Sequence, residues 1–316
     1  MTFDENERVP TQYHPSWFEG YRYVYPVVSR RSRGVSLGVN LSPTKLCNFR
    51  CVYCQVDRGE NRAEIDRAIA TTVPEQASSR DVLGRSHSCG GMVDLDVLES
   101  EILRLARASL DGELFKVERF AAVERSKRVL RDFAFSGDGE PTLAPQFPEA
   151  VSRLADARRR LGYDPLKLVL ITNATRLERP EIARALDELC ASNGEIWAKL
   201  DAGDPEWLRA VDRTAIPFET IVRNIEFAAK RWRVKIQTAL FSWRGAGPTD
   251  EQFLRYCRRV REIMEAGGQV EAAQLYTVAR EPAEPDAGPL PNDVMDRCAE
   301  VLRRETGLSV EVFYSR

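Results

Sequence analysis

Three cysteines stand close together in the sequence, directly after a short apolar run. Cys47, Cys51 and Cys54 are separated by three and then two residues. The apolar residues that precede them occupy every second position and are Val35, Leu37, Val39 and Leu41. Such alternation predicts a β-strand that is buried on one face. The sequence therefore places a group of thiols in the loop that follows a strand, and we expect the chemistry of the chain to begin there.

Three thiolates in one loop favour an open iron–sulfur cluster over a closed zinc site. Cysteine thiolates are the usual ligands of [4Fe–4S] clusters, and three of them leave one of the four irons without a protein ligand. A structural zinc site takes four ligands, commonly as two pairs. The remaining cysteines and the histidines form no second pair: Cys89, Cys190, Cys257, Cys298, His14 and His87. A structural zinc protein is therefore the weaker alternative, and a role for Cys89 as a fourth ligand is not indicated by its spacing.

Composition limits the class of protein. With 316 residues and 43% hydrophobic residues, the chain can form one large or two smaller domains. Its 46 basic and 48 acidic residues give a net charge of −2, which demands neither a nucleic-acid nor a membrane partner. No apolar run reaches the roughly 18 residues that span a bilayer, and the acidic first residues do not resemble a secretory signal. We predict a cytoplasmic protein whose seven cysteines stay reduced.

Short β-like runs then alternate with helical ones along most of the chain. After the strand that precedes the cysteines, we predict strands over residues 133–136, 168–172, 196–200, 234–241 and 271–278. The predicted helices between and after them cover residues 148–161, 180–190, 218–232, 250–266 and 292–306. This alternation is typical of parallel strands joined by crossover helices. It predicts an α/β protein, a partial (β/α)6 TIM-like barrel with parallel strands.

The remaining segments fit around this barrel. We interpret residues 1–34 as an N-terminal extension whose aromatic residues cover the barrel, and residues 35–316 as the barrel domain. Residues 57–93 form a long insertion without periodicity, which is typical of a lid or a disordered loop. Two amphipathic helices are predicted next, one starting near Asp94 and one over residues 114–130. A final apolar run, residues 308–314, predicts an additional edge strand.

Polar residues follow several of the predicted strands. In β/α barrels the chemistry lies at the carboxyl ends of the strands. The second strand ends in the glycine-rich acidic segment 136–143, the third at Asn173, the fourth at Lys199 and Asp201, and the sixth carries Gln274, Tyr276 and Arg280. Polar side chains are costly to bury unless they are paired. Their recurrence in one layer predicts a wet, ligand-filled mouth, and the run Arg30 to Arg33 is a further candidate for contact with an anionic partner.

The sequence resembles the radical S-adenosylmethionine (SAM) superfamily. Residues 47–54, CNFRCVYC, match its CxxxCxxC signature, including the aromatic Tyr53 before the last cysteine. Residues 135–143, 199–202 and 274–280 are similar to the group of iron–sulfur oxidoreductases related to the wybutosine-synthesising tRNA enzymes. The resemblance implies that Cys47, Cys51 and Cys54 hold a [4Fe–4S] cluster, and that the amino and carboxylate groups of SAM chelate its free iron.

The resemblance also suggests residues that contact SAM. The family's glycine–glycine–glutamate–proline motif, which binds the SAM amino group, is partly matched by Gly137, Asp138, Gly139 and Glu140, where Asp138 separates the glycines. Which of the two acids meets the ammonium group stays open. Asn173, Lys199 and Asp201 become candidates for the ribose or carboxylate of SAM, or for substrate. The backbone near Tyr53 and the sixth strand, with Gln274 and Tyr276, would flank the adenine.

The function implied by the resemblance is that of a radical SAM enzyme of oxidoreductase or transferase type. A reduced cluster cleaves SAM to a 5′-deoxyadenosyl radical, which abstracts hydrogen from a substrate. The substrate, a small molecule, tRNA or peptide, is not identified by the sequence, and neither are further catalytic residues. We expect an electron donor such as a flavodoxin or ferredoxin and no membrane partner. The alternatives are a tRNA base-modifying enzyme and a non-enzymatic electron-transfer module with a coordinatively closed cluster.

Overall fold

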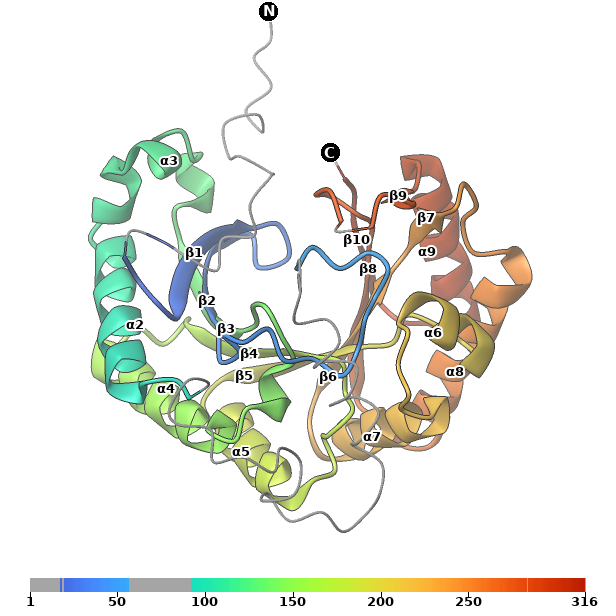
Figure 1. Cartoon of the computed structure of the whole chain (residues 1–316), viewed down its shortest axis with the longest axis horizontal. Coiled ribbons are helices and arrows are strands. Elements are labelled where there is room, and N and C mark those ends of the chain that lie inside the picture. Colours follow the sequence, from blue (N-terminus) through green and yellow to red (C-terminus); the bar gives the residue numbers. More distant parts are fainter. Residues whose placement is uncertain (1–17, 19, 57–91, 283, 316) are drawn as a thin grey trace, which may run out of the picture.

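A curled sheet of eight strands organises the described part of the chain (Figure 1). The computed structural model describes residues 18, 20–56, 92–282 and 284–315. The strand order is β1-β2-β3-β4-β5-β6-β8-β10. The strands are β1 (Val24–Ser29), β2 (Gly34–Val39), β3 (Leu130–Phe135), β4 (Lys167–Thr172), β5 (Gly194–Lys199), β6 (Val234–Ala239), β8 (Val270–Tyr276) and β10 (Val310–Phe313). Neighbouring strands from β2 to β10 are parallel, and β1 is antiparallel to β2. The predicted partial TIM-like barrel is confirmed, with β10 as its added edge strand.

Helices cover the convex face of the sheet (Figure 1). These outer helices are α2 (Leu95–Leu110), α4 (Phe147–Leu161), α5 (Pro180–Ala191), α7 (Phe218–Arg231), α8 (Asp250–Glu265) and α9 (Asn292–Thr306). Alternate residues of each strand point at them and form the main core, for example Leu37, Phe133, Leu168 and Ile236, each 0% exposed. Full burial of such a side chain contributes about 1.5 to 3 kcal/mol. The intervening residues face the concave side, where polar side chains and a cavity lie.

Two predicted elements differ from the structure. Residues 114–130 do not form one helix but a 3₁₀ helix η2 (Glu113–Lys116), a short α3 (Glu118–Ala121) and a 3₁₀ helix η3 (Arg125–Lys127). Val117 has an extended backbone between the first two, and Arg128 donates to the carbonyls of Val123 and Ala121, at 2.7 and 2.8 Å. The side chain thus satisfies carbonyls that a continuing helix would have used.

The predicted strand over residues 234–241 also ends early. β6 stops at Ala239, whose N–H donates to Asp201 Oδ1 at 2.8 Å instead of to a neighbouring strand. The chain then turns away into β7 (Phe241–Trp243), which pairs antiparallel with β9 (Ala287–Pro289). A side-chain acceptor therefore interrupts the ladder at the carboxyl end of the sheet.

The β1–β2 hairpin reaches from one edge of the curled sheet to the other. β1 lies in the predicted N-terminal extension, and the division at residue 35 stays a prediction. At the hairpin tip, Arg30 donates to the carbonyl of Tyr314 and Arg33 forms an ion pair with Glu311 of β10 at 3.4 Å. The tip therefore lies beside the last strand of the same sheet.

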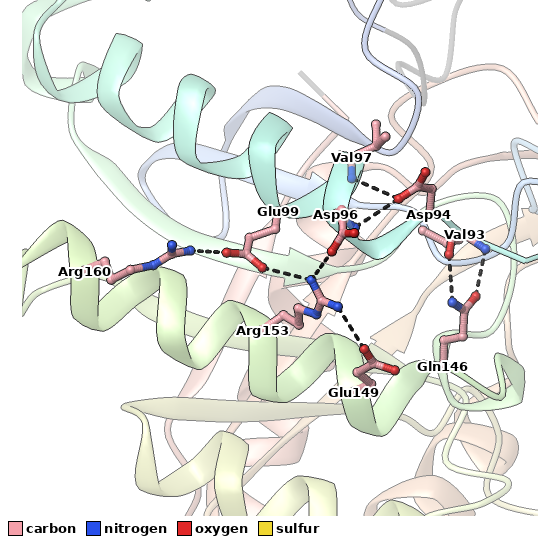
Figure 2. A network of polar contacts seen from close by, with 9 residues as sticks. All are labelled: Val93, Asp94, Asp96, Val97, Glu99, Gln146, Glu149, Arg153 and Arg160. Atoms are coloured by element: carbon pink, nitrogen blue, oxygen red, sulfur yellow. Dashed lines mark hydrogen bonds and ion pairs between the residues drawn. The ribbon is translucent and has the colours of Figure 1, made fainter.

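Polar contacts fix the chain where α2 begins (Figure 2). Asp94 caps the helix by accepting from the N–H groups of Asp96 and Val97, both at 3.1 Å. The side chain of Gln146 pairs with both backbone groups of Val93 at 2.7 Å. Between α2 and α4, Arg153 contacts Asp96, Glu99 and Glu149, and Arg160 contacts Glu99.

The predicted insertion, with His87 and Cys89, lies outside the described residues. Among the helices of the described ranges, none combines the length and apolarity that crossing a bilayer requires.

Candidate functional site

The cysteine loop follows β2 and lines a cavity of about 400 Å³ on the concave side of the sheet. Cys47, Cys51 and Cys54 are half-buried and all three contribute to the cavity wall. The predicted position of the thiols, after a strand and at the mouth of the barrel, therefore agrees with the fold.

The backbone of this loop is held by the segment that ends α6 (Pro205–Val211). Arg50 N–H donates to the carbonyl of Asp212 at 2.9 Å, and Val52 N–H to that of Val211 at 2.8 Å. Thr214 Oγ1 donates to the carbonyl of Asn48 at 2.9 Å. Beneath the loop, Val52 packs into a small apolar cluster, whose other buried members are Val211, Ala239, Phe241 and Ala287. The shape of the loop is thus determined by contacts with the chain after β5.

The glycine-rich turn after β3 packs directly on the cysteine loop. Glu140 N–H donates to the carbonyl of Leu46 at 2.9 Å. A Cβ atom at Gly139 would lie 2.1 Å from that same carbonyl oxygen. Gly137 has φ +122°, a conformation that favours glycine. The turn predicted to contact SAM is therefore brought against the thiol loop, as the resemblance implies.

The two acids of this turn have different surroundings. Glu140 is 3% exposed and accepts hydrogen bonds from Thr142 N and Oγ1, Thr172 Oγ1 and Asn173 N, at 2.7 to 3.1 Å. Burial raises the pKa of Glu140 although these bonds oppose the rise. Asp138 accepts from Asn40 Nδ2 at 2.9 Å and lines the cavity. Glu140 thus ties the ends of β3 and β4 together, and both acids line the cavity.

Asn173 and Lys199 both lie close to sulfur atoms of the cysteine loop. Asn173 Nδ2 lies 3.9 Å from Cys47 Sγ and 2.6 Å from Asn48 Oδ1. Lys199 Nζ lies 3.7 Å from Cys51 Sγ. Phe49 N–H adds a donor 3.4 Å from Cys47 Sγ. Donors around the sulfurs suit thiolate ligands, because hydrogen bonds and positive charge stabilise their negative charge.

Lys199 also belongs to a buried polar group with Tyr53 and Asp201. It donates to the Tyr53 hydroxyl and forms an ion pair with Asp201 at 3.0 Å, and Tyr53 donates to Asp201. Burial alone would lower the pKa of Lys199, but Asp201 and its other neighbours raise it. Asp201 itself is 5% exposed and does not line the main cavity. Asp201 therefore holds Tyr53 and Lys199 in position from the side away from the cavity.

Sequence reasoning missed Asp212, which is 0% exposed beside this group. Its Oδ1 lies 3.5 Å from the Tyr53 hydroxyl, and its Oδ2 has no hydrogen-bond partner in the described part of the chain. Burial, followed by the nearby Asp201 carboxylate, raises the pKa of Asp212 to about 8. No signal in the sequence separates it from the neighbouring acids Asp204 and Glu206.

Gln274 and Tyr276, the two candidates on β8, have different surroundings. Tyr276 lines the cavity, and the Arg31 guanidinium lies 4.6 Å above its ring centre. Gln274 is 1% exposed, accepts from Gln237 at 2.8 Å and donates to Glu311 at 3.0 Å. Tyr276 thus lies on the cavity wall, whereas the side chain of Gln274 is buried among other strands.

The donor set suits a cluster better than a single ion. In residues 18–56 and 92–315, where placed, no three Cys, His, Asp or Glu side chains converge on one metal-ion position. A [4Fe–4S] cluster makes no such demand, since each thiolate binds a different iron. The three thiols on one cavity wall, with donors near the sulfurs of Cys47 and Cys51, fit this group.

The chain is similar to curated proteins at low identity. A curated relative, "GTPase Obg" of Brachyspira hyodysenteriae, is 21% identical over 289 residues, which is 91% of this chain. The chain spans only about a third of the length of the curated relatives that it matches, 34% in each case.

Solved structures support the fold. "Structure of TYW1 with a lysine-pyruvate adduct bound" matches with a TM-score of 0.52 at 14% identity, over 87% of this chain and 74% of that one. SuiB of Streptococcus suis bound to S-adenosylmethionine matches with a TM-score of 0.51 at 10% identity, over 85% and 48%.

The family assignment comes from the sequence itself. The family model described as "Radical SAM superfamily" matches residues 41–260. This range covers most of the chain and contains the cysteine loop, the glycine-rich turn, Asn173 and Lys199. The chain therefore belongs to the radical SAM superfamily.

Proposed function

We propose that Cys47, Cys51 and Cys54 hold a [4Fe–4S] cluster and that the chain uses it with SAM to abstract hydrogen from a substrate. Membership of the superfamily makes the chain an enzyme and implies an iron–sulfur cluster and SAM. When bound, these groups supply the reductive cleavage of the sulfonium and the radical that abstracts hydrogen. The observation that carries the proposal is the loop of three thiols on the cavity wall, with the glycine-rich turn packed against it.

The chain's own residues would bind and orient these groups. Lys199 and Asn173 would donate toward the sulfurs of Cys51 and Cys47, which stabilises a negatively charged cluster. Asp138, on the cavity wall beside the glycine-rich turn, would accept from the SAM ammonium group. Tyr276 offers a ring face to the adenine. Glu140, Asp201 and Gln274 would act as positioning residues, since their polar atoms contact other parts of the protein.

We further propose a substrate, an electron donor and a cytoplasmic location. The substrate is a small molecule, tRNA or a peptide, and a flavodoxin or ferredoxin supplies the electron. Modification of tRNA is supported only by the similarity of fold to TYW1.

Reconstitution tests the proposal. The purified chain is loaded anaerobically with iron and sulfide, reduced with dithionite and mixed with SAM. We expect about four irons per chain and formation of 5′-deoxyadenosine. Cys47→Ser, Cys51→Ser and Cys54→Ser should each lose both, whereas Cys190→Ser, on the outer helix α5, should keep both.

Three results would contradict the proposal. Wild-type protein that binds the cluster but never cleaves SAM is not this enzyme. A cluster whose spectrum is unchanged by SAM and which is lost in Cys89→Ser would indicate the closed electron-transfer module instead. Zinc in anaerobically prepared protein would indicate the structural alternative.

A further inference from the structure

We propose that Arg31 and Arg280 bind an anionic group of the substrate, a phosphate or a carboxylate, where the β1–β2 hairpin borders the cavity. This inference rests on the proposed function, because it describes the substrate of the same site. It assigns a ligand class that the cysteine loop and the glycine-rich turn do not define.

Three guanidinium groups gather on this side of the cavity. Arg30 and Arg31, at the hairpin tip, and Arg280, after β8, all contribute to its wall. Arg30 donates to a backbone carbonyl, that of Tyr314, and Arg31 lies 3.4 Å from the neutral Gln237 Oε1. No ion pair joins any of the three to a carboxylate in the described ranges. Arg33, at the same hairpin tip, has such a partner in Glu311.

Clustered cations without counter-ions are unfavourable in a partly buried site. A charge removed from water is costly unless it is paired. Burial lowers the pKa of Arg31, and burial together with repulsion from Arg31 and Arg280 lowers that of Arg30. Guanidinium groups nevertheless stay protonated. An anion bound between them would supply the missing countercharge.

The arrangement also provides the geometry for anion binding. The Arg31 guanidinium lies 4.6 Å from the ring centre of Tyr276, and both residues line the cavity. Contacts of Arg30 and Arg33 with the last strand hold the hairpin tip on which Arg31 lies. A planar guanidinium matches carboxylate and phosphate oxygens in a bidentate manner.

Acidic and basic side chains therefore lie on different sides of the cavity. The acids Asp138 and Glu140 lie at the end of β3, whereas Arg31 and Arg280 belong to the hairpin and to the chain after β8. A third acid of the cavity wall, Asp132, accepts a hydrogen bond from Ser36 of the hairpin. The first side suits the ammonium of SAM, and the second suits an anion. We assign the guanidinium groups of the second side to the substrate, whereas Tyr276 beside them would still contact the adenine.

Anion binding to the folded chain without cluster tests this assignment. Inorganic phosphate and acetate are titrated separately, with chloride keeping the ionic strength constant, and binding is measured by calorimetry and by the shift in Tm. We expect Arg31→Gln and Arg280→Gln each to weaken binding about tenfold or more. Arg184→Gln, which removes an exposed arginine on α5, should bind like wild type. Arg31→Lys should keep part of the affinity, because it keeps the charge but not the bidentate fork.

The outcomes separate the sources of the anion. Binding of phosphate but not acetate indicates a phosphate-bearing substrate, and the reverse indicates a carboxylate. No binding to wild type, or equal binding by all variants, overturns the assignment. If Arg31→Gln does not fold, judged by circular dichroism, Arg280→Gln decides the same question.

A second measurement separates substrate from SAM. Reconstituted Arg280→Gln should bind SAM like wild type and still form 5′-deoxyadenosine. Weaker SAM binding with unchanged phosphate and acetate binding would assign the arginines to SAM and overturn the proposal. Failure of SAM cleavage in wild type would instead contradict the proposed function, whatever the anion titration shows.

Discussion

Gly139 lies where the cysteine loop and the glycine-rich turn approach most closely. A Cβ atom there would be 2.1 Å from the Leu46 carbonyl oxygen and 2.6 Å from Ser42 Cβ. Backbone atoms cannot move aside as a flexible side chain can. The glycine therefore sets the distance between the thiols and the turn.

We expect Gly139→Ala to lower the free energy of unfolding by about 3 kcal/mol, because the added methyl group overpacks the contact. It should also reduce iron incorporation, since relief of the clash displaces the cysteine loop. Urea unfolding and iron analysis measure the two effects.

Gly162→Ala is the matched control. Gly162 has φ +62° and open space around its Cβ position, so only backbone strain of about 1 kcal/mol is expected, with normal iron content. Equal losses in the two variants would refute the steric explanation.

The grouping of the three thiols was predictable, because it follows from local spacing. Cys47, Cys51 and Cys54 are recognisable from three positions within one loop, and the structure places them on the cavity wall. Gln274 was not distinguishable from a ligand contact, because its partners Gln237 and Glu311 come from other strands. A position at a strand end indicates proximity to the mouth but not the direction of the side chain.

At the scale of elements, Gln146 joins the start of α2 to the start of α4 (Figure 2). Its side chain satisfies both the N–H and the carbonyl of Val93. We expect Gln146→Ala to lower the free energy of local opening at Val93 to Val97 by about 1 to 2 kcal/mol, the contribution of two hydrogen bonds. Native-state hydrogen exchange measures this change.

The exposed Gln269 serves as a control, because its side chain makes no hydrogen bond within the described ranges. Gln269→Ala should leave exchange at Val93 to Val97 unchanged. Unchanged exchange in Gln146→Ala as well would show that Asp94 alone fixes the start of α2.

Elements with a regular apolar period were predicted well, and those shaped by side-chain contacts were not. The helices α4, α5, α7, α8 and α9 lie within a few residues of the predicted ranges. Residues 114–130 contain similar apolar spacing, but Arg128 satisfies carbonyls there and the chain forms short turns. β1 contains Pro26, which weakens a strand pattern but is tolerated on a sheet edge.

At the scale of the whole molecule, a charged group crosses three strands near the amino end of the barrel. Glu195 of β5 forms ion pairs with Lys167 of β4 and with Lys235 of β6, the latter at 2.9 Å. Trp197 Nε1 donates to it at 2.9 Å. Burial alone would raise the pKa of Glu195, but these three donors outweigh it and the pKa is lowered from its ordinary 4.5.

We expect Glu195→Gln to lower the free energy of unfolding by about 1 to 2 kcal/mol at pH 7. Because the folded-state pKa is depressed, the stabilisation is fully present above pH 4.5. It is lost as the pH falls through the folded-state pKa below that value. Urea unfolding of both proteins at several pH values measures the difference.

Glu271→Gln, an exposed glutamate of β8, should show a small difference at every pH. A difference between wild type and Glu195→Gln that persisted unchanged in acid would show that packing, not charge, is responsible.

The overall architecture followed from the alternation of strands and helices, which fixes parallel neighbours once crossovers are assumed. Closure between the hairpin tip and β10 could not be predicted in this way. It depends on Arg30 and Arg33 meeting residues nearly 300 positions away, at Tyr314 and Glu311.

The hydrogen bonds of the cysteine loop to the carbonyls of Val211 and Asp212 make its shape depend on a later part of the chain. These carbonyls belong to the chain after β5, so the loop acquires its shape only when that part of the sheet has formed. The entropy of ordering the loop is then already lost before any iron arrives. If the three thiols hold a cluster as proposed, we expect it to bind after this part of the sheet has folded. A chain that ends before residue 212 would contain the thiols but would lack the contacts that shape the loop.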